Sequence, residues 1–546
     1  MLSLAEIARG LWAASLSPSD SILGTSNLSI LAAGALIAVA HSIIHYTRSP
    51  WRSLPLGPSG YPILGSALKL LDIDWVMKDC KRLYGDIVYI NIAGQPALLL
   101  NSQKVANDLL NRRAAVSSNR PRFIVSGELM CGGLMIPNQQ ADEQWRRMRR
   151  MANDGLKEAV SSKYHDMERE EAIYLTLALS KNPMESSRAY HRFASSIVLA
   201  ITYDRPLRGA KSDETVLRKV EDFSRLLHEK VVPGAHLVES FPWMLHIPAW
   251  LARWKREALL CYEINTKFFY ELMEDVEQRT ASISCTYGPN GTARHCLTNT
   301  LLEEQARYGT SRPEVAWTAG GMYIAGSDTM TTQLEWFTVA MIAFPETQQR
   351  AQEEIDAFVG QARLPTFADL PHLPYMSAMV RELLRWRTGL HFAVPHAYER
   401  DDWYEGMFIP KGTLCFPNIY VCNLDPDLYG DDAHAFNPAR FLDENGKLRP
   451  TLPDTFDEGH VSFGFGRRLC IGRHVAVDAL SIAALTLLWA FKVENAKDSR
   501  GEKIHVDPYA FAEGLQTVPK PFQCSITPRF PEAGAILLAE TELHAQ

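Results

Sequence analysis

The 546-residue sequence contains little cysteine and no long block of one charge. Its nine cysteines are sparse and odd in number, which argues against a disulfide scaffold and favours a reducing compartment with at least one free thiol. No run of five or more basic residues occurs, and 56 basic against 63 acidic residues give a net charge of −7, so nothing indicates binding to nucleic acid through phosphate contacts. No repeat with a period of about 20–50 residues is found, which argues against a solenoid.

Two nucleotide-binding signatures are also missing. We find no GxGxxG followed by an acidic residue within a βαβ unit and no Walker loop, so the chain is not expected to bind a nicotinamide of its own. What is present is typical of a packed globular protein, because 46% of the residues are hydrophobic and 22% are charged. The length allows about three or four modules, or one unusually large domain.

One uncharged apolar run lies near the N-terminus. Residues 28–44 carry no charge over about 17 positions, near the lower limit for a helix that spans a bilayer. We predict a transmembrane anchor at 28–46, preceded by an N-terminal lumenal segment at 1–27. Two arginines closely follow the run whereas one precedes it, and this bias places the long C-terminal part in the cytosol. A cleaved signal peptide that ends near residues 38–40 is the alternative.

Prolines mark the boundary between this segment and the rest of the chain. Four of them between Pro50 and Pro62 fix φ and remove hydrogen-bond donors, which predicts a semi-rigid strap without helix. We therefore expect a Pro/Gly-rich hinge at 47–65 and one large domain at 66–546.

The large domain alternates helical patterns with short β-rich runs, so we expect a mainly α protein with small β-sheets, an α+β fold. A hairpin is predicted at 87–100, with Gly94-Gln95-Pro96 between its strands. A short strand is predicted at 407–409. Long helices are predicted from about 311 to 341 and from 475 to 491.

Trp145 and Arg149 form the first candidate group. On a helix they lie one turn apart on the same face, where they offer an indole N–H and a guanidinium to one anionic group. A basic helix face beside one buried tryptophan is the alternative.

The predicted central helix holds the second group. It begins with a capping box at 311–314 and contains the small-residue run 325–329 (AGSDT). Gly326 costs about 1 kcal/mol in a helix relative to alanine, so small residues here let a bulky group approach the backbone. Thr329 either bonds the carbonyl four residues earlier or opens that turn and presents its hydroxyl beside Asp328 to a ligand or water. Tight helix packing is the alternative to a ligand site.

Glu382 and Arg385 form the third group, three residues apart on a predicted helix. Such pairs are usually solvated and contribute only about 0.3 kcal/mol. Here apolar neighbours flank the pair, and burial would leave spare donors and acceptors, so a third partner is needed. Arg440 is the candidate.

Cys470 lies in the fourth group, the run 463–472 (FGFGRRLCIG). Glycines on both sides let the backbone fold tightly around the sulfur, and the free N–H groups of the following helix favour a thiolate. A thiolate that is shielded by Phe463 suits an iron ligand, and Arg468 would then face a carboxylate of the cofactor. A buried structural cysteine in a loop-to-helix turn is the alternative.

Taken together, these residues resemble the cytochrome P450 family. The FxxGxRxCxG pattern is filled at every fixed position by Phe463, Gly466, Arg468, Cys470 and Gly472. ExxR, AGxDT and WxxxR precede it in the family's order, and the resemblance spans nearly the whole chain. It implies the cytochrome P450 fold, with a long central helix over the haem and one N-terminal transmembrane helix.

The resemblance also implies a role for each group. Cys470 is the implied ligand of the iron of heme b, and Thr329 with Asp328 is the implied pair that relays protons to dioxygen. The ExxR pair together with Arg440 is implied to fix the cysteine loop. The other implied cofactor-binding residues are propionate partners, members of the cysteine loop, and residues that make room over the haem: Arg468, Trp145, Arg149 and His396; Phe463 and Gly464; Ala325 and Gly326.

The implied activity is insertion of one oxygen atom from O2 into a hydrophobic small molecule, while the second atom leaves as water. Electrons would come from a membrane-bound NADPH–cytochrome P450 reductase, with cytochrome b5 as a further partner. No nucleic-acid partner is expected. The implied location is the endoplasmic reticulum membrane, with one span and with the haem-binding catalytic domain at 66–546 in the cytosol.

Two stretches, 340–356 and 394–413, look like fungal monooxygenases of secondary metabolism. A terpenoid or polyketide intermediate is therefore the expected substrate. Fatty-acid or xenobiotic hydroxylation is the alternative, and a haem-thiolate isomerase or gas-binding protein is the alternative from a different class.

Two surfaces follow from the resemblance. A cationic face on the cysteine side would dock an acidic flavin domain, and its members are Arg146, Arg147, Arg150, Arg467 and Arg473. A substrate pocket with few charges would bring together Phe123, Tyr323, Phe392 and Leu515.

Overall fold

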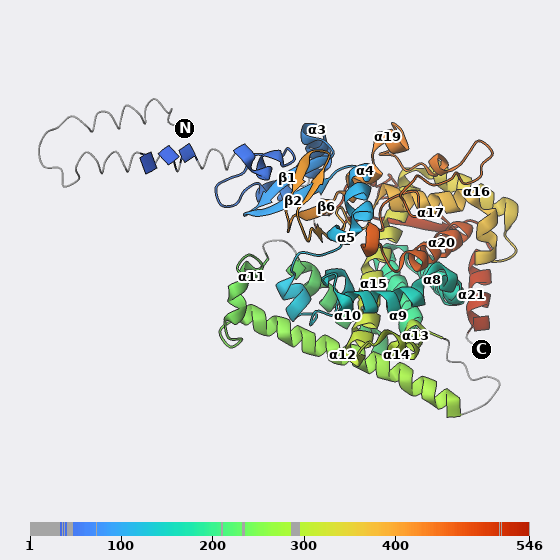
Figure 1. Cartoon of the computed structure of the whole chain (residues 1–546). Coiled ribbons are helices and arrows are strands. Elements are labelled where there is room, and N and C mark those ends of the chain that lie inside the picture. Colours follow the sequence, from blue (N-terminus) through green and yellow to red (C-terminus); the bar gives the residue numbers. More distant parts are fainter. Residues whose placement is uncertain are drawn as a thin grey trace, which may run out of the picture. The chain divides into compact units, whose positions relative to one another are not determined.

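The computed structural model describes residues 47–72, 74–208, 211–231, 235–285, 295–512, 514 and 516–544, together with six positions near the N-terminus: Ala33, Gly34, Leu36, Ile37, Val39 and Ala40. The chain divides into two compact units. The smaller consists of Met1–Pro55 and Asp402–Pro410, and the larger of Leu56–Asp401 and Lys411–Gln546. Figure 1 shows that helices make up most of the larger unit.

The smaller unit has one turn of 3-10 helix and a β-hairpin. The turn spans Pro50–Ser53, and its proline stands at the first position, where a missing N–H leaves no helical bond unmade. The predicted non-helical strap thus contains one short turn. Strand β4 (Asp402–Tyr404) pairs with β5 (Met407–Ile409), which confirms the strand expected at 407–409. Trp51 packs edge-on against Phe408, with ring centroids 6.2 Å apart.

The larger unit is mainly helical with two small sheets, as the sequence predicts. Its helices are α3 (Cys80–Tyr84), α4 (Gln103–Ala106), α5 (Ala114–Ser117), α6 (Glu143–Leu156), α7 (Glu158–Ser161), α8 (His165–Lys181), α9 (Ser186–Tyr203), α10 (Lys211–Val231), α11 (Leu237–Ser240), α12 (Arg253–Cys285), α13 (Leu297–Glu303), α14 (Gln305–Tyr308), α15 (Arg312–Ala343), α16 (Pro345–Phe358), α17 (Pro374–Trp386), α18 (Ile419–Asn423), α19 (Pro426–Tyr429), α20 (Arg473–Ala490) and α21 (Ala533–His544). Its strands are β1 (Ile87–Ile92), β2 (Gln95–Leu100), β3 (His396–Ala397), β6 (Leu414–Pro417), β7 (Phe491–Asn495) and β8 (Cys524–Pro528).

The four-stranded sheet has the order β1-β2-β6-β3, and β7 pairs with β8 in the second sheet. The predicted hairpin is present as β1 and β2, but its turn is shorter than expected. Ala93 and Gly94 form the whole turn, with φ of 50° and 93°. Positive φ at both positions suits the right-handed twist of the strands. Pro96 therefore belongs to β2, at a position before the parallel pairing with β6 begins at Ala97.

Helix α15 runs through the middle of the larger unit (Figure 1), packed against α9, α12, α17 and α20. The predicted capping box is confirmed, because the Ser311 N–H donates to the Glu314 carboxylate at 2.7 Å. Most of its side chains are buried, including Trp317 and Trp336. A helix that is covered on all sides can place residues deep inside the molecule.

One helix within the described ranges, α20, is long and apolar enough to cross a membrane, but most of it is buried as in a core helix. The anchor predicted at 28–46 lies outside the described residues except for the six positions named above. It remains a prediction, as do the boundaries at 1–27, 47–65 and 66–546.

Candidate active site

Cys470 lies in a tight loop just before α20. Gly464 and Gly466 in this loop have φ of 82° and 56°, a region that other residues rarely adopt. A Cβ at Gly466 would also overlap the carbonyl oxygen of Leu110. The Cys470 N–H donates to the Phe463 carbonyl at 2.9 Å and closes the loop. The two predicted glycines before the sulfur are thus required by the backbone, whereas the one after it has φ of −85° and room for a Cβ.

Cys470 is an exposed residue, yet enough protein surrounds its sulfur to change the pKa of the thiol. Burial raises the pKa of its thiol, whereas the Gly472 N–H, followed by Arg149 and Arg473, lowers it. The residue is nevertheless exposed. Both observations hold if the sulfur faces a space inside the molecule. A metal ion removes the proton from a thiol that coordinates it, so this sulfur suits a metal ligand whose charge a backbone N–H and nearby cations stabilise.

Ala325 and Gly326 face different surroundings on α15. Ala325 is exposed although Ile324 and Ser327 beside it are buried, which marks a space next to the middle of this helix. A Cβ at Gly326 would lie 2.7 Å from Val198 of α9. Of the two roles that the sequence left open for Gly326, the structure shows tight helix packing.

Thr329 and Asp328 have separate partners. The Thr329 hydroxyl donates to the Ala325 carbonyl at 2.9 Å, so the helical turn stays closed. The Asp328 carboxylate accepts a hydrogen bond from Ser224 of α10 and lies 3.9 Å from Nε2 of His191 on α9. The two side chains are therefore adjacent in sequence but do not bond to each other. Sequence reasoning missed Ser224 and His191, since only the fold brings α9 and α10 to this point.

Arg468 and Trp145 form a stacked pair. The guanidinium of Arg468 lies 4.0 Å from the centre of the Trp145 ring. Trp145 is buried, and its indole nitrogen is a buried donor without a hydrogen-bond partner. A buried donor without a partner is costly, which indicates that a ligand completes it. Arg468 donates to three backbone carbonyls, those of Ser118, Ile136 and Gln139, at 2.7–3.2 Å.

Arg149 and Arg120 converge with Arg468. Arg149 donates to the Leu469 carbonyl beside Cys470. Burial lowers the pKa of Arg149 to about 10 and that of Arg468 to about 9. The pKa of Arg120 is held well below its usual range by burial, then by Arg468 and Arg149. None of the three forms an ion pair with a carboxylate among the residues that the structure describes. We call Arg120, Arg149 and Arg468 the arginine cluster.

Arg120 was missed by sequence reasoning. It donates to the carbonyls of Pro137, Val394 and Pro395 at 2.6–3.0 Å. Backbone carbonyls leave no pattern in a sequence, so nothing in the loop around Arg120 indicated its burial.

His396 lies on β3 beside the arginine cluster. Its Nδ1 is 2.8 Å from the Ser117 carbonyl, so Nδ1 carries the proton in this contact. Burial, followed by Arg120, holds the pKa of His396 well below its usual value. The ring is therefore neutral in these surroundings.

Glu382, Arg385 and Arg440 form a closed network away from this loop. Arg385 donates to both Glu382 oxygens at 2.6 and 2.7 Å, and Arg440 donates to Glu382 at 3.0 Å. Glu382 and Arg385 are fully buried. The predicted third partner is confirmed. Arg385 also bonds the carbonyls of Asn423 and Ala433, which ties α17 to the segment before the cysteine loop.

The donor set fits a haem group. Three guanidiniums and an indole N–H without acidic partners match the two carboxylates of a haem, and the sulfur of Cys470 matches its iron. The mainly helical fold and this site together define a haem-thiolate protein.

Comparison with known proteins agrees. A profile of the cytochrome P450 family matches residues 55–525. A cytochrome P450 monooxygenase of Armillaria gallica is 44% identical over 511 residues, which cover 93% of this chain and 96% of the relative. Cytochrome P450 monooxygenase 58 of Postia placenta is 39% identical over 529 residues, with 96% and 98% covered. Cytochrome P450 monooxygenase iboC of Amanita muscaria is 37% identical over 539 residues, with 90% and 94% covered.

The chain belongs to the cytochrome P450 family. It is a haem-containing monooxygenase, an oxidoreductase, and the family generally uses a reductase partner and hydrophobic substrates.

The substrate pocket stays a prediction, and the structure shows local contacts of two of its residues. Tyr323 is fully buried near Ser195 of α9, and Phe392 packs edge-on against Phe416, 6.3 Å between centroids. Leu515 lies outside the described residues.

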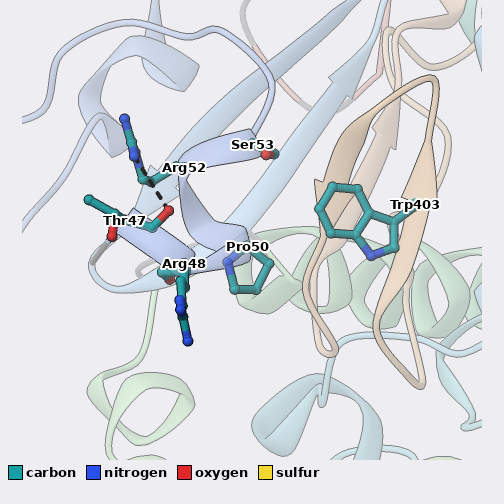
Figure 2. Close-up of a pocket in the computed structure, with 7 residues that line it drawn as sticks. Thr47, Arg48, Pro50, Arg52, Ser53 and Trp403 are labelled. Atoms are coloured by element: carbon teal, nitrogen blue, oxygen red, sulfur yellow. Dashed lines mark hydrogen bonds between the residues drawn. The ribbon is translucent and has the colours of Figure 1, made fainter. Parts of the chain in front are cut away.

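Figure 2 shows an open hollow in the smaller unit, which contains none of the predicted site residues. Its lining includes Arg52, whose guanidinium donates to the Thr47 carbonyl at 3.4 Å. We assign this hollow no catalytic role. The remaining lining residues are Arg48, Ser49, Pro50, Ser53 and Trp403.

The predicted cationic face is partly neutralised. Arg147 pairs with Glu314, and Arg473 lies 3.8 Å from Glu458. Arg146 bonds Glu143 at 3.3 Å. The other two arginines, at 150 and 467, are exposed and form no ion pair within the described part of the chain.

Proposed function

We propose that Cys470 binds the haem iron and that the arginine cluster, with Trp145, binds the haem carboxylates. The observation that carries this proposal is the convergence of three arginines, two buried and Arg149 half-buried, without a carboxylate partner among the described residues, beside the cysteine loop. A buried charge normally has a partner. The carboxylates of the haem would supply it, and His396 would lie at the same edge.

Haem, when bound, supplies the activation of dioxygen and the transfer of one oxygen atom. The chain's own residues would bind, orient and protonate. Ala325 leaves space beside α15, and Phe463 would shield the sulfur. Thr329 holds its hydroxyl proton on the Ala325 carbonyl, so it must leave that bond before it can donate toward the reaction. Asp328, whose carboxylate accepts a hydrogen bond from Ser224, would supply a new proton to Thr329 from the side of α9 and α10.

The proposed substrate is a terpenoid or polyketide intermediate of fungal secondary metabolism. The support is the similarity to monooxygenases of fungi and the small apolar residue at the exposed position on α15. Fatty-acid or xenobiotic hydroxylation is the alternative substrate class within the same reaction.

The proposed location is the cytosolic face of the endoplasmic reticulum membrane, with the predicted anchor and a membrane-bound NADPH reductase, and with cytochrome b5 as a second donor. Large apolar side chains are exposed around α11 and the start of α12. They support contact with a lipid surface, because clusters of exposed apolar side chains often mark sites of membrane or protein contact. Those that are more than half exposed are Leu237, Phe241, Trp243, Trp250, Leu251, Leu260 and Ile264.

The test is expression with a reductase in a host that is fed candidate terpenes, followed by mass spectrometry. We expect a product that has gained one oxygen atom. Cys470→Ala should abolish both this product and the carbon-monoxide difference band of the reduced protein. Thr329→Ala should keep the band and lower the ratio of product to NADPH consumed. A good haem spectrum with no oxidised product across the panel would contradict the proposed substrate class.

A further inference from the structure

A second group of ligand-type side chains lies where α8 packs on α20, side by side in Figure 1. His165 and Glu168 stand three residues apart on α8, and Asp478 faces them from α20. One ligand atom from each side chain lies within 4.8 Å of the others. His165 Nε2 is 3.4 Å from an Asp478 oxygen. Two ligands on one tetrahedral zinc ion are about 3.3–3.5 Å apart, so this pair already has the required spacing.

Glu168 is the residue that nothing else in the fold explains. It is fully buried, and both of its carboxylate oxygens are without a hydrogen-bond partner. Burial, followed by the like charge of Asp478, raises its pKa well above the usual value. No cation of the described residues opposes these two effects. A buried carboxylate without a partner is expensive, and one of its oxygens lies within 4.8 Å of ligand atoms of the other two members of the cluster.

The surroundings leave a route for an ion. The side chains of His165 and Asp478 are 28% and 25% exposed, so the cluster opens to solvent on one side while Glu168 closes the other. The His165 ring is stacked on Phe367, with centroids 3.7 Å apart and planes 7° apart. This stacking fixes the direction of the ring, as a metal ligand needs.

We propose that His165, Glu168 and Asp478 bind one zinc ion that links α8 to α20. One imidazole nitrogen and two carboxylates suit Zn²⁺, whereas Ca²⁺ and Mg²⁺ prefer oxygen ligands alone. The two negative charges balance the ion, and water takes the fourth position. Since α20 begins directly after the cysteine loop, the ion would hold the helix that supports Cys470 without touching the haem.

The test is equilibrium dialysis of the haem-loaded protein against zinc chloride, with bound metal counted by plasma mass spectrometry. We expect one zinc ion per haem. Glu168→Gln and Asp478→Asn should each lower the affinity more than tenfold. Glu168→Gln keeps the shape of the side chain, and the haem spectrum verifies that each variant is folded.

His372→Gln is the matched control, because His372 also stacks on a phenylalanine, Phe358, but belongs to no such cluster among the described residues. It should bind zinc as the unchanged protein does. In the unchanged protein, zinc at about one hundred times its dissociation constant should raise the Tm by about 2–3 °C. The rise should be absent in Glu168→Gln. The proposal would be overturned by no uptake at millimolar zinc. It would also be overturned if Glu168→Gln and Asp478→Asn bound zinc with the affinity of the unchanged protein.

Discussion

Two buried groups of arginines in this protein differ in how their charge is balanced. Arg385 and Arg440 share Glu382, and Arg440 also meets Asp432 at 3.0 Å. The arginine cluster of residues 120, 149 and 468 bonds only backbone carbonyls on the described part of the chain. Arg149 lowers the pKa of Arg468, and both of them lower the pKa of Arg120.

The difference separates a structural network from a binding site. A network that is complete within the chain stabilises the fold whether or not a ligand is present. A set of buried cations that repel one another is favourable only with an anion between them. The family's cofactor carries two carboxylates, so the incomplete group is the one that we propose to bind it.

The largest expected effect comes from opening the complete network. Glu382→Gln leaves Arg385 buried without a countercharge, so the free energy of unfolding should fall by about 3–5 kcal/mol. Thermal unfolding of the purified protein measures this. Asp432→Asn is the control, because the Asp432 side chain is 50% exposed and its loss should cost less than about 1 kcal/mol. If both variants lost the same free energy of unfolding, the burial of Glu382 would not make it more important for stability than the exposed Asp432.

The second prediction concerns the incomplete group. Arg149→Met removes a cation that no carboxylate balances, so the stability of the apoprotein should change by less than about 1 kcal/mol, the value of its one bond to Leu469. Haem binding should weaken by about tenfold, since a charge-assisted hydrogen bond is lost. Transfer of haem to apomyoglobin measures its rate of loss. A large destabilisation with unchanged haem loss would make the cluster structural.

The third prediction is a pH dependence of the apoprotein. The pKa of His396 is well below that of an unfolded histidine, so the unfolded chain binds a proton that the folded chain does not. This contribution is full above about pH 6.5 and is lost as the pH falls, by about 1.4 kcal/mol per pH unit. Urea unfolding at several pH values measures the slope, which His396→Asn should reduce.

Haem sharpens this prediction. Its carboxylates would balance Arg120 and Arg468 and let the pKa of His396 rise, so the slope should be smaller with haem bound. If the free energy of unfolding had the same pH dependence with and without haem, the haem carboxylates would not affect the pKa of His396.

The smallest effect on stability is expected at the surface. Arg467→Glu and Arg150→Glu should change the free energy of unfolding by less than about 0.5 kcal/mol. If these residues dock a reductase, the rate of electron transfer should fall and lose part of its salt dependence. Arg218→Glu on α10 is the control. Stopped-flow measurement of the rate of reduction by the reductase compares the three variants. Equal rates in all three would contradict the proposed docking face.

Much of the site could be predicted from the sequence because its parts are local. The glycines around Cys470, the capping box of α15 and the one-turn spacing of Trp145 and Arg149 each reflect backbone geometry over a few residues. Even the distant partner Arg440 followed from counting the unmet donors and acceptors of a buried ion pair.

What could not be predicted depends on contacts between elements. Arg120 is held by three carbonyls from two other loops, and Asp328 by Ser224 on a helix more than a hundred residues earlier. The role of Gly326 was decided by Val198 on α9. The hairpin turn differed from the predicted one for a local reason. Ala93 adopts a positive φ, which an alanine in the sequence does not predict.

The contacts at the start of α15 fix which way each residue further along that helix faces. Glu314 caps Ser311 and also pairs with Arg147 of α6, so two helices share one carboxylate at this end. Because a helix rises 1.5 Å and turns 100° per residue, Ala325 stands about 16 Å further along the axis. A slip of one residue at Glu314 would rotate Ala325 away from its open space and bring a bulkier neighbour into it. Which residue faces the open space is thus set some three turns away, by the hydrogen bond and the ion pair of one carboxylate.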